Sequence, residues 1–97
     1  MAQIIYSERA LLHLERLFEF LAQENSASGV DAVAAIRGAV EVLSDHPMIG
    51  RGTEEGLREL VISFGRTGYI ALYWFSQERD EVQILGVRHQ RELDYPA

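Results

Sequence analysis

The feature that most constrains the fold is a pair of apolar runs near the C-terminal end, joined by a short polar turn. The first run, 69–75, is apolar throughout, and the second spans 82–87. Runs of this length that are rich in β-branched and aromatic residues predict strands, and a short link makes them antiparallel neighbours. A third run, 57–63, precedes them and is followed by the turn FGRTG. We therefore expect a three-stranded antiparallel meander, with 69–75 as a central strand covered on both faces.

The N-terminal half predicts one short strand followed by a helix. QIIY at 3–6 is the strand, and Ser7 is placed to cap a helix that runs to about residue 24. The spacing of its apolar residues predicts that one face of this helix is buried, while His13 lies on the flank and is expected to be solvated. The predicted stripe is Leu11, Leu14, Phe18 and Leu21.

A second helix is expected from about Gly29 to just before His46-Pro47, because the residue ahead of a proline is pushed out of the helical region. Its apolar residues repeat at the same spacing, and a short link makes the two helices an antiparallel hairpin. The order is then β-α-α-β-β-β. This order predicts a single α+β domain over residues 1–97, with an N-terminal strand and an α-helical hairpin packed on an antiparallel β-sheet. The pairing position of strand 3–6 stays open.

Composition excludes several classes of chemistry. The chain has no cysteine, which removes disulfides, thiolate metal sites and cysteine nucleophiles. The histidines show no metal-ligand spacing, so we expect neither a metal nor another cofactor. Nine arginines, no lysine and a net charge of −6 argue against a free-standing nucleic-acid binder. Neither a signal peptide nor a membrane-spanning run is recognisable, and we expect a cytoplasmic protein with no membrane contact.

Ionisable side chains gather where the last predicted strand ends. His89, Glu92 and Tyr95 are of the types that serve as acid or base, and Arg88 and Arg91 could stabilise negative charge. With Arg66 from the preceding turn, these residue types would suit RNA cleavage. The same side chains also suit structural ion pairs or contacts with a partner, and a tyrosine at a domain edge commonly packs its ring.

Four local signatures, taken with the order of elements, resemble the RelE/ParE superfamily of bacterial type II toxins. They are LSDHPMIGR, the LREL of 57–60, GRTGYIALY and ILGVRHQRE. The ParE branch, often called plasmid stabilisation proteins, matches best through HPMIGR and VRHQRE. The resemblance implies a cognate antitoxin, ParD-like in this branch, whose C-terminal segment wraps over the toxin. It also implies one of two targets, because RelE-type members cut mRNA on the ribosome whereas ParE-type members bind and poison DNA gyrase.

One position of the resemblance separates the two branches. RelE-type nucleases carry an arginine one place after the tyrosine of GRTGYIALY, where this chain has Ile70. Their second catalytic arginine would fall at or beside His89, where Arg88 and Arg91 could substitute for it. Tyr95 stands where they carry a C-terminal tyrosine. The acidity of the chain also opposes approach to ribosomal phosphates. We therefore expect a non-enzymatic, ParE-like gyrase inhibitor. A RelE-like ribosome-dependent endoribonuclease, or a degenerate member that only binds its antitoxin, remains the alternative.

No residue is assigned a catalytic role. The expected partners are the antitoxin, in a hetero-oligomer, and gyrase, without sequence-specific nucleic-acid binding; a homodimer of the lone chain stays open. Tyr73 and Trp74 are expected to be core residues rather than a platform for bases. The residues expected to contact the target or the antitoxin are Arg58, Arg66, Arg88, His89, Arg91 and Tyr95.

Overall fold

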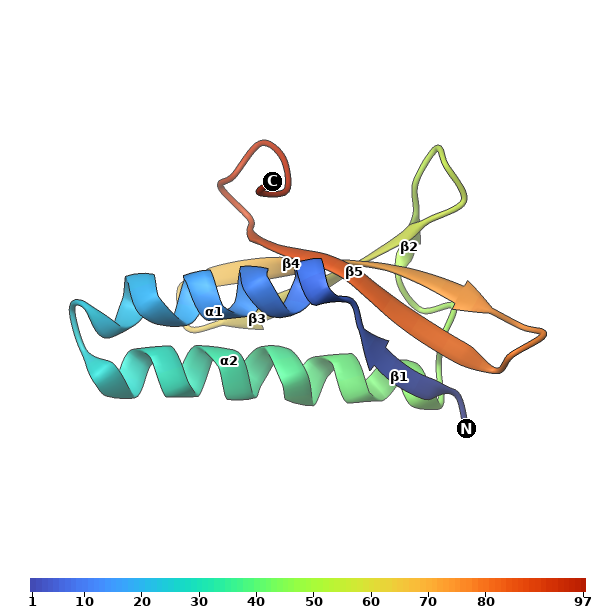
Figure 1. Cartoon of the computed structure of the whole chain (residues 1–97), viewed down its shortest axis with the longest axis horizontal. Coiled ribbons are helices and arrows are strands. Elements are labelled where there is room, and N and C mark those ends of the chain that lie inside the picture. Colours follow the sequence, from blue (N-terminus) through green and yellow to red (C-terminus); the bar gives the residue numbers. More distant parts are fainter.

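The protein is a five-stranded sheet with two helices packed side by side on one face (Figure 1). The computed structural model describes the backbone of residues 1–97 and every side chain except that of Ser26. Within this described chain, no helix combines the length and the apolar character that crossing a bilayer requires. The elements are β1 (Gln3–Tyr6), α1 (Glu8–Ala22), α2 (Ser26–Glu41), a 3₁₀ turn (Val42–Ser44), β2 (Arg51–Gly52), β3 (Arg58–Phe64), β4 (Thr67–Ser76) and β5 (Glu81–His89).

The strands lie in the order β1-β5-β4-β3-β2. The meander β3-β4-β5 is antiparallel, and β4 is the central strand, as the sequence predicts. β1 pairs in parallel with β5, with Gln3 opposite Glu81, so the sheet is mixed rather than purely antiparallel. β2 was not predicted, because two residues carry no alternating pattern. The α+β fold class is confirmed.

The first helix begins where the sequence places it and the second does not. The side chain of Ser7 accepts a hydrogen bond from the Ala10 backbone N–H, which is the expected N-cap of α1. α2 begins at Ser26 rather than near Gly29, because the Asn25 side chain accepts from the Ala27 N–H and caps the helix there. The link between the helices is correspondingly short.

The buried face of α1 is rotated from the predicted stripe. Ala10, His13 and Leu14 are buried, whereas Leu11 is 47% exposed and Phe18 is 38% exposed. The expectation that His13 is solvated was wrong, since it is only 2% exposed. α1 lies against β5.

The core lies between the helices and the sheet. Strand alternation decides which side chains enter it, because successive side chains point to opposite faces. Tyr73 is fully buried, but its neighbour Trp74 points to the other face and is 40% exposed, so the prediction that both are core was wrong for Trp74. The largest fully buried side chains besides Tyr73 are Tyr69, Ile36, Leu43, Ile84, Val40, Val82 and Val87.

Tyr73 also holds the loop that precedes β2. Its hydroxyl donates to the Pro47 carbonyl at 2.8 Å and accepts the Gly50 N–H at 2.9 Å. A Cβ on Gly50 would lie 2.6 Å from this hydroxyl, so only glycine allows the approach. Through these bonds, a core tyrosine positions the chain beside β3.

We expect Tyr73→Phe to lower the free energy of unfolding by about 1–3 kcal/mol, because the buried Gly50 N–H and Pro47 carbonyl lose their partner. Tyr6→Phe is the matched control, since the Tyr6 hydroxyl is buried and has no hydrogen-bond partner among the described residues. Urea denaturation of both variants measures the difference. Equal stabilities would show that the Tyr73 hydroxyl contributes nothing.

Candidate functional site

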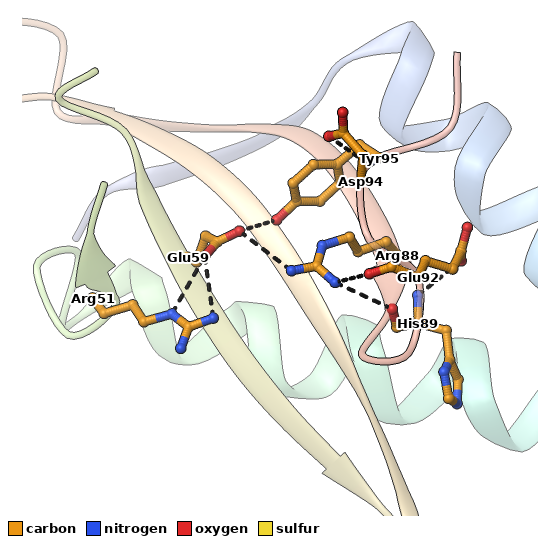
Figure 2. A network of polar contacts seen from close by, with 7 residues as sticks. All are labelled: Arg51, Glu59, Arg88, His89, Glu92, Asp94 and Tyr95. Atoms are coloured by element: carbon orange, nitrogen blue, oxygen red, sulfur yellow. Dashed lines mark hydrogen bonds and ion pairs between the residues drawn. The ribbon is translucent and has the colours of Figure 1, made fainter. Parts of the chain in front are cut away.

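Strand alternation separates the charged residues at the end of β5. Tyr69 is opposite His89 in the β4–β5 pair, and Ile70 is opposite Arg88. Tyr69 belongs to the core beneath the helices, and its ring meets that of His89 edge-on with centroids 5.4 Å apart. His89 therefore faces the helices, whereas Arg88 faces the outer side of the sheet. Figure 2 shows the His89 ring directed away from the polar contacts around Arg88.

On the outer side, a partly buried carboxylate organises what we call the Glu59 cluster: Glu59, Arg51, Arg88 and Tyr95. Glu59 Oε2 accepts a 2.6 Å hydrogen bond from the Tyr95 hydroxyl and lies 4.0 Å from Arg88 Nη2. Its Oε1 lies 3.2 Å from Arg51 Nη2 (Figure 2). Arg88 and Glu59 come from β5 and β3, the two strands that flank β4. One carboxylate thus joins two strands and the C-terminal segment.

The C-terminal segment also encloses Arg88. The Arg88 guanidinium donates to the Glu92 carbonyl and lies 5.2 Å from the centre of the Tyr95 ring, a cation–π distance. Its Nε is buried and has no hydrogen-bond partner in the described part of the chain. Only 13% of the Arg88 side chain is exposed. The cation is thus enclosed by residues of its own chain.

The environment of Tyr95 keeps its hydroxyl protonated. Burial raises the pKa of Tyr95, and the hydrogen bond to the Glu59 carboxylate raises it further, while the nearby Arg88 guanidinium lowers it. At neutral pH the phenol is a hydrogen-bond donor already committed to Glu59. It can act neither as a base nor as a free proton donor while that bond is intact.

A second anchor ties the C-terminal segment to α1. The Pro96 carbonyl accepts from Arg9 Nη2 at 2.8 Å and lies 2.9 Å from His13 Nε2. His13 Nδ1 accepts the Val87 N–H at 3.0 Å, so the neutral ring must carry its proton on Nε2. Gly86 makes room, because a Cβ there would lie 3.2 Å from both the His13 and the Tyr95 rings. The segment curls over the side of the sheet away from α2 (Figure 1).

Burial lowers the pKa of His13, and the nearby Arg9 and Arg16 charges lower it further, against the raising effects of the Pro96 hydrogen bond and of Glu92. The periodicity of α1 contained a signal for its burial, since His13 follows Ala10 by three positions and precedes Leu17 by four. Sequence reasoning missed it because the stripe was traced through Leu11.

The helix-facing residues line a pocket of about 640 Å³ at the far end of α1. Arg66 comes from the β3–β4 turn, His89 from the end of β5, and Arg91 from the segment that follows. Arg16 of α1 completes the charged rim and was not among the predicted site residues. His89 is held by a hydrogen bond between its ring and the Thr67 hydroxyl. We call this the arginine pocket.

Arg58 belongs to neither group. Its Nη1 donates to the carbonyls of Gly50 at 2.8 Å and Met48 at 3.2 Å, and these bonds support the loop ahead of β2. The predicted site residues thus lie in three places: Arg88 and Tyr95 outside the sheet, Arg66, His89 and Arg91 in the pocket, and Arg58 beside the loop. Among the described side chains, no three histidine or acidic groups gather as metal ligands.

Replacing Glu59 tests the outer-face cluster. We expect Glu59→Gln to lower the free energy of unfolding by about 1–3 kcal/mol, because the enclosed Arg88 loses the one carboxylate that pairs with it among the described side chains. The pKa of Tyr95 should fall, since the Glu59 charge helps to raise it. Urea denaturation and ultraviolet titration of the phenols measure the two effects. Glu55→Gln, in an exposed loop, is the control; an unchanged Tyr95 titration would contradict the cluster.

Acidification tests the His13 anchor. The pKa of His13 is lower in the folded state than in the unfolded state, so protons bind more tightly to the unfolded chain. The contribution of neutral His13 to the free energy of unfolding is therefore full above the unfolded pKa of about 6.5 and declines as the pH falls below it. One such proton changes the free energy of unfolding by at most about 1.4 kcal/mol per pH unit. We expect His13→Gln to flatten the decline between about pH 6.5 and 5, as measured by urea denaturation. The exposed His46→Gln should leave it unchanged; equal slopes for both variants would reject this role.

Comparisons with known proteins agree with this architecture. The chain is 30% identical to Toxin RelE3 of Caulobacter vibrioides over 92 residues, which cover 95% of this chain and 98% of that protein. The solved structure titled "Chromosomal ParDE TA system from P. aeruginosa" superposes with a TM-score of 0.74 at 22% identity, over 92% of this chain and 96% of the other, and shows the same fold. Residues 4–94 match the family model of the ParE toxin of the type II toxin–antitoxin system parDE. The chain belongs to the ParE toxin family of type II toxin–antitoxin systems.

Proposed function

We propose that this chain is a toxin that acts by binding and inhibiting DNA gyrase, without catalysis, and that a ParD-like antitoxin neutralises it. Membership of the ParE toxin family supports a toxin with an antitoxin partner. The choice of gyrase rests on the chemistry of the outer face of the sheet. The main observation in favour of gyrase is that Glu59 accepts a hydrogen bond from Tyr95 and pairs with Arg88, so that both groups are already engaged within the chain.

Cleavage of RNA through its 2′-hydroxyl needs a base, an acid and a cation free to meet the phosphate. On the outer face, Tyr95 is protonated and donates to Glu59, and the Arg88 guanidinium is enclosed by the Glu92 carbonyl and the Tyr95 ring. A phosphate could reach this cation only after the C-terminal segment had moved. The resting arrangement is therefore that of a recognition surface rather than of a nuclease site.

Ile70 removes a second requirement for cleavage. It lies opposite Arg88 on β4 and is 6% exposed, so the strand offers an alkyl group where the related nucleases carry a phosphate-binding arginine. The net charge of −6 also repels this chain from ribosomal RNA at long range. Both observations favour a protein target over an RNA target.

An endoribonuclease is the second candidate. The relative named Toxin RelE3 carries the name of the RelE branch, and this chain has an arginine and a tyrosine, Arg88 and Tyr95, close together at the end of the sheet. If a ribosome displaced the C-terminal segment, these two groups would become accessible together. The two candidates differ in whether the Tyr95 hydroxyl matters.

Induction of the chain alone in bacteria, with supercoiling by purified gyrase and ribosome-dependent mRNA cleavage as readouts, separates these candidates. We expect growth arrest and inhibition of supercoiling, both retained in Tyr95→Phe, because no proton transfer by the hydroxyl is needed. Tyr6→Phe is the control for loss of a tyrosine hydroxyl. Cleavage of mRNA that Tyr95→Phe abolishes would establish the nuclease instead. An absence of growth arrest would leave a chain that only binds its antitoxin.

A further inference from the structure

The arginines of this chain divide into two groups by what their guanidinium groups contact. Five are engaged within the protein: Arg9 with Pro96, Arg37 over the Tyr6 ring, Arg51 with Glu59, Arg58 with Met48 and Gly50, and Arg88 in the Glu59 cluster. For the other four, the described residues supply no ion pair, guanidinium hydrogen bond or cation–π contact. These four are Arg16, Arg66, Arg79 and Arg91.

Three of the four uncommitted arginines surround the arginine pocket. Arg16, Arg66 and Arg91 come from α1, the β3–β4 turn and the segment after β5, so three separate parts of the chain converge there. The fourth, Arg79, lies in the β4–β5 turn and does not line it. The gathering is notable in a chain with 15 acidic residues against nine arginines, since uniform pairing would have neutralised them.

The acids near the pocket do not neutralise it. Glu92 is the one carboxylate among its lining residues, and its Oε1 accepts a 3.0 Å hydrogen bond from the His89 N–H. That bond turns the carboxylate toward the backbone of β5. The N–H donors of the three guanidinium groups are therefore not taken up by carboxylates of the described chain, and each guanidinium fork matches a carboxylate of a ligand.

The floor of the pocket is apolar. Leu17, Phe20 and Leu21 of α1 form it together with Tyr69, and Phe20 is 66% exposed. An exposed phenylalanine beside a concave apolar surface is typical of a site that a partner covers. A ligand that satisfies this pocket must bring apolar groups for the floor and negative charges for the rim, at the spacing of neighbouring side chains.

We propose that the arginine pocket binds an acidic, amphipathic segment of a protein partner, with carboxylates on Arg16, Arg66 and Arg91 and apolar side chains on the floor. The identification of that partner with the antitoxin rests on the proposed function, whereas the chemistry of the segment does not. A peptide alternates apolar groups and carboxylates as the pocket requires. A nucleic acid brings a continuous phosphate array, which a chain of net charge −6 repels.

The test uses the full chain, labelled for NMR, and a helical probe peptide built from repeating leucine and glutamate. A second peptide has glutamine at every glutamate. We expect the glutamate peptide to shift the resonances of Leu17, Thr67 and the three arginine side chains, and to bind about tenfold more tightly than the glutamine peptide, as three partly exposed ion pairs would give. Equal binding of both peptides, or no shift at the pocket, would overturn the proposal.

Variants separate the pocket from general electrostatics. Arg16→Gln, Arg66→Gln and Arg91→Gln combined should remove the preference for glutamate, while Arg79→Gln should preserve it. The backbone spectrum of the combined variant verifies its fold, and if it fails to fold, the three single variants replace it. An RNA hexamer that binds the same arginines more tightly than the glutamate peptide would overturn the proposal in favour of nucleic acid.

A binding assay with the protein encoded by the neighbouring gene tests whether the partner is the antitoxin. We expect the combined variant to weaken that complex about tenfold, with a smaller dependence on salt. Undiminished affinity would show that the antitoxin binds elsewhere, while the toxin assignment would stand. Failure of the neighbour to bind the wild-type chain would count against the proposed function instead, and the peptide titration would still decide the chemistry of the pocket.

Discussion

The rest of the molecule depends on how the backbone hydrogen bonds are completed along one edge of β5, the edge that faces away from β4. β1 pairs only with residues 81–84, so the continuation of β5 would leave backbone groups unpaired. α1 completes the edge with side chains, since Ser7 Oγ donates to the Leu85 carbonyl and His13 Nδ1 accepts the Val87 N–H. The helix is thereby fixed against the strand at two points. Because Nε2 of the same histidine meets the Pro96 carbonyl, completing the edge also fixes the C-terminal segment.

The direction of the side chains along β5 then decides what its terminal residues can do. Arg88 and His89 are adjacent in sequence, but alternation sends the first to the outer face and the second to the helix side. A cluster of acid, base and cation would need both on one face. Arg88 therefore contacts Glu59 and Tyr95 on the outer face. His89 instead lines the arginine pocket with Arg66 and Arg91. The ionisable groups that are close in sequence therefore form two surfaces with different chemistry.

The sequence contains most of the fold, because the fold follows from local signals. The strands at 3–6 and in the meander, and the Ser7 cap, all follow from patterns within a few residues. What it does not contain is the pairing of distant groups. Glu59 is visible as an acid that interrupts an apolar strand, but only the sheet shows that it meets Arg88 and Tyr95. The position of β1 could not be predicted for the same reason, since its partner β5 lies at the other end of the chain.

The two faces differ in how their positive charge is satisfied, and this difference is invisible in the sequence. Arg88 is enclosed by groups of its own chain, so its removal would leave the partly buried Glu59 carboxylate without this partner rather than vacate a binding site. Arg66 and Arg91 extend from a turn and from the segment after β5, and no carboxylate of the described residues pairs with them, so their charge remains available to a partner. In a chain without lysine, every permanently charged cationic side chain is a planar, directional donor. An arginine that contacts a carboxylate, a carbonyl or an aromatic ring of its own chain stabilises the fold. An arginine without such a contact keeps its donors available for a partner.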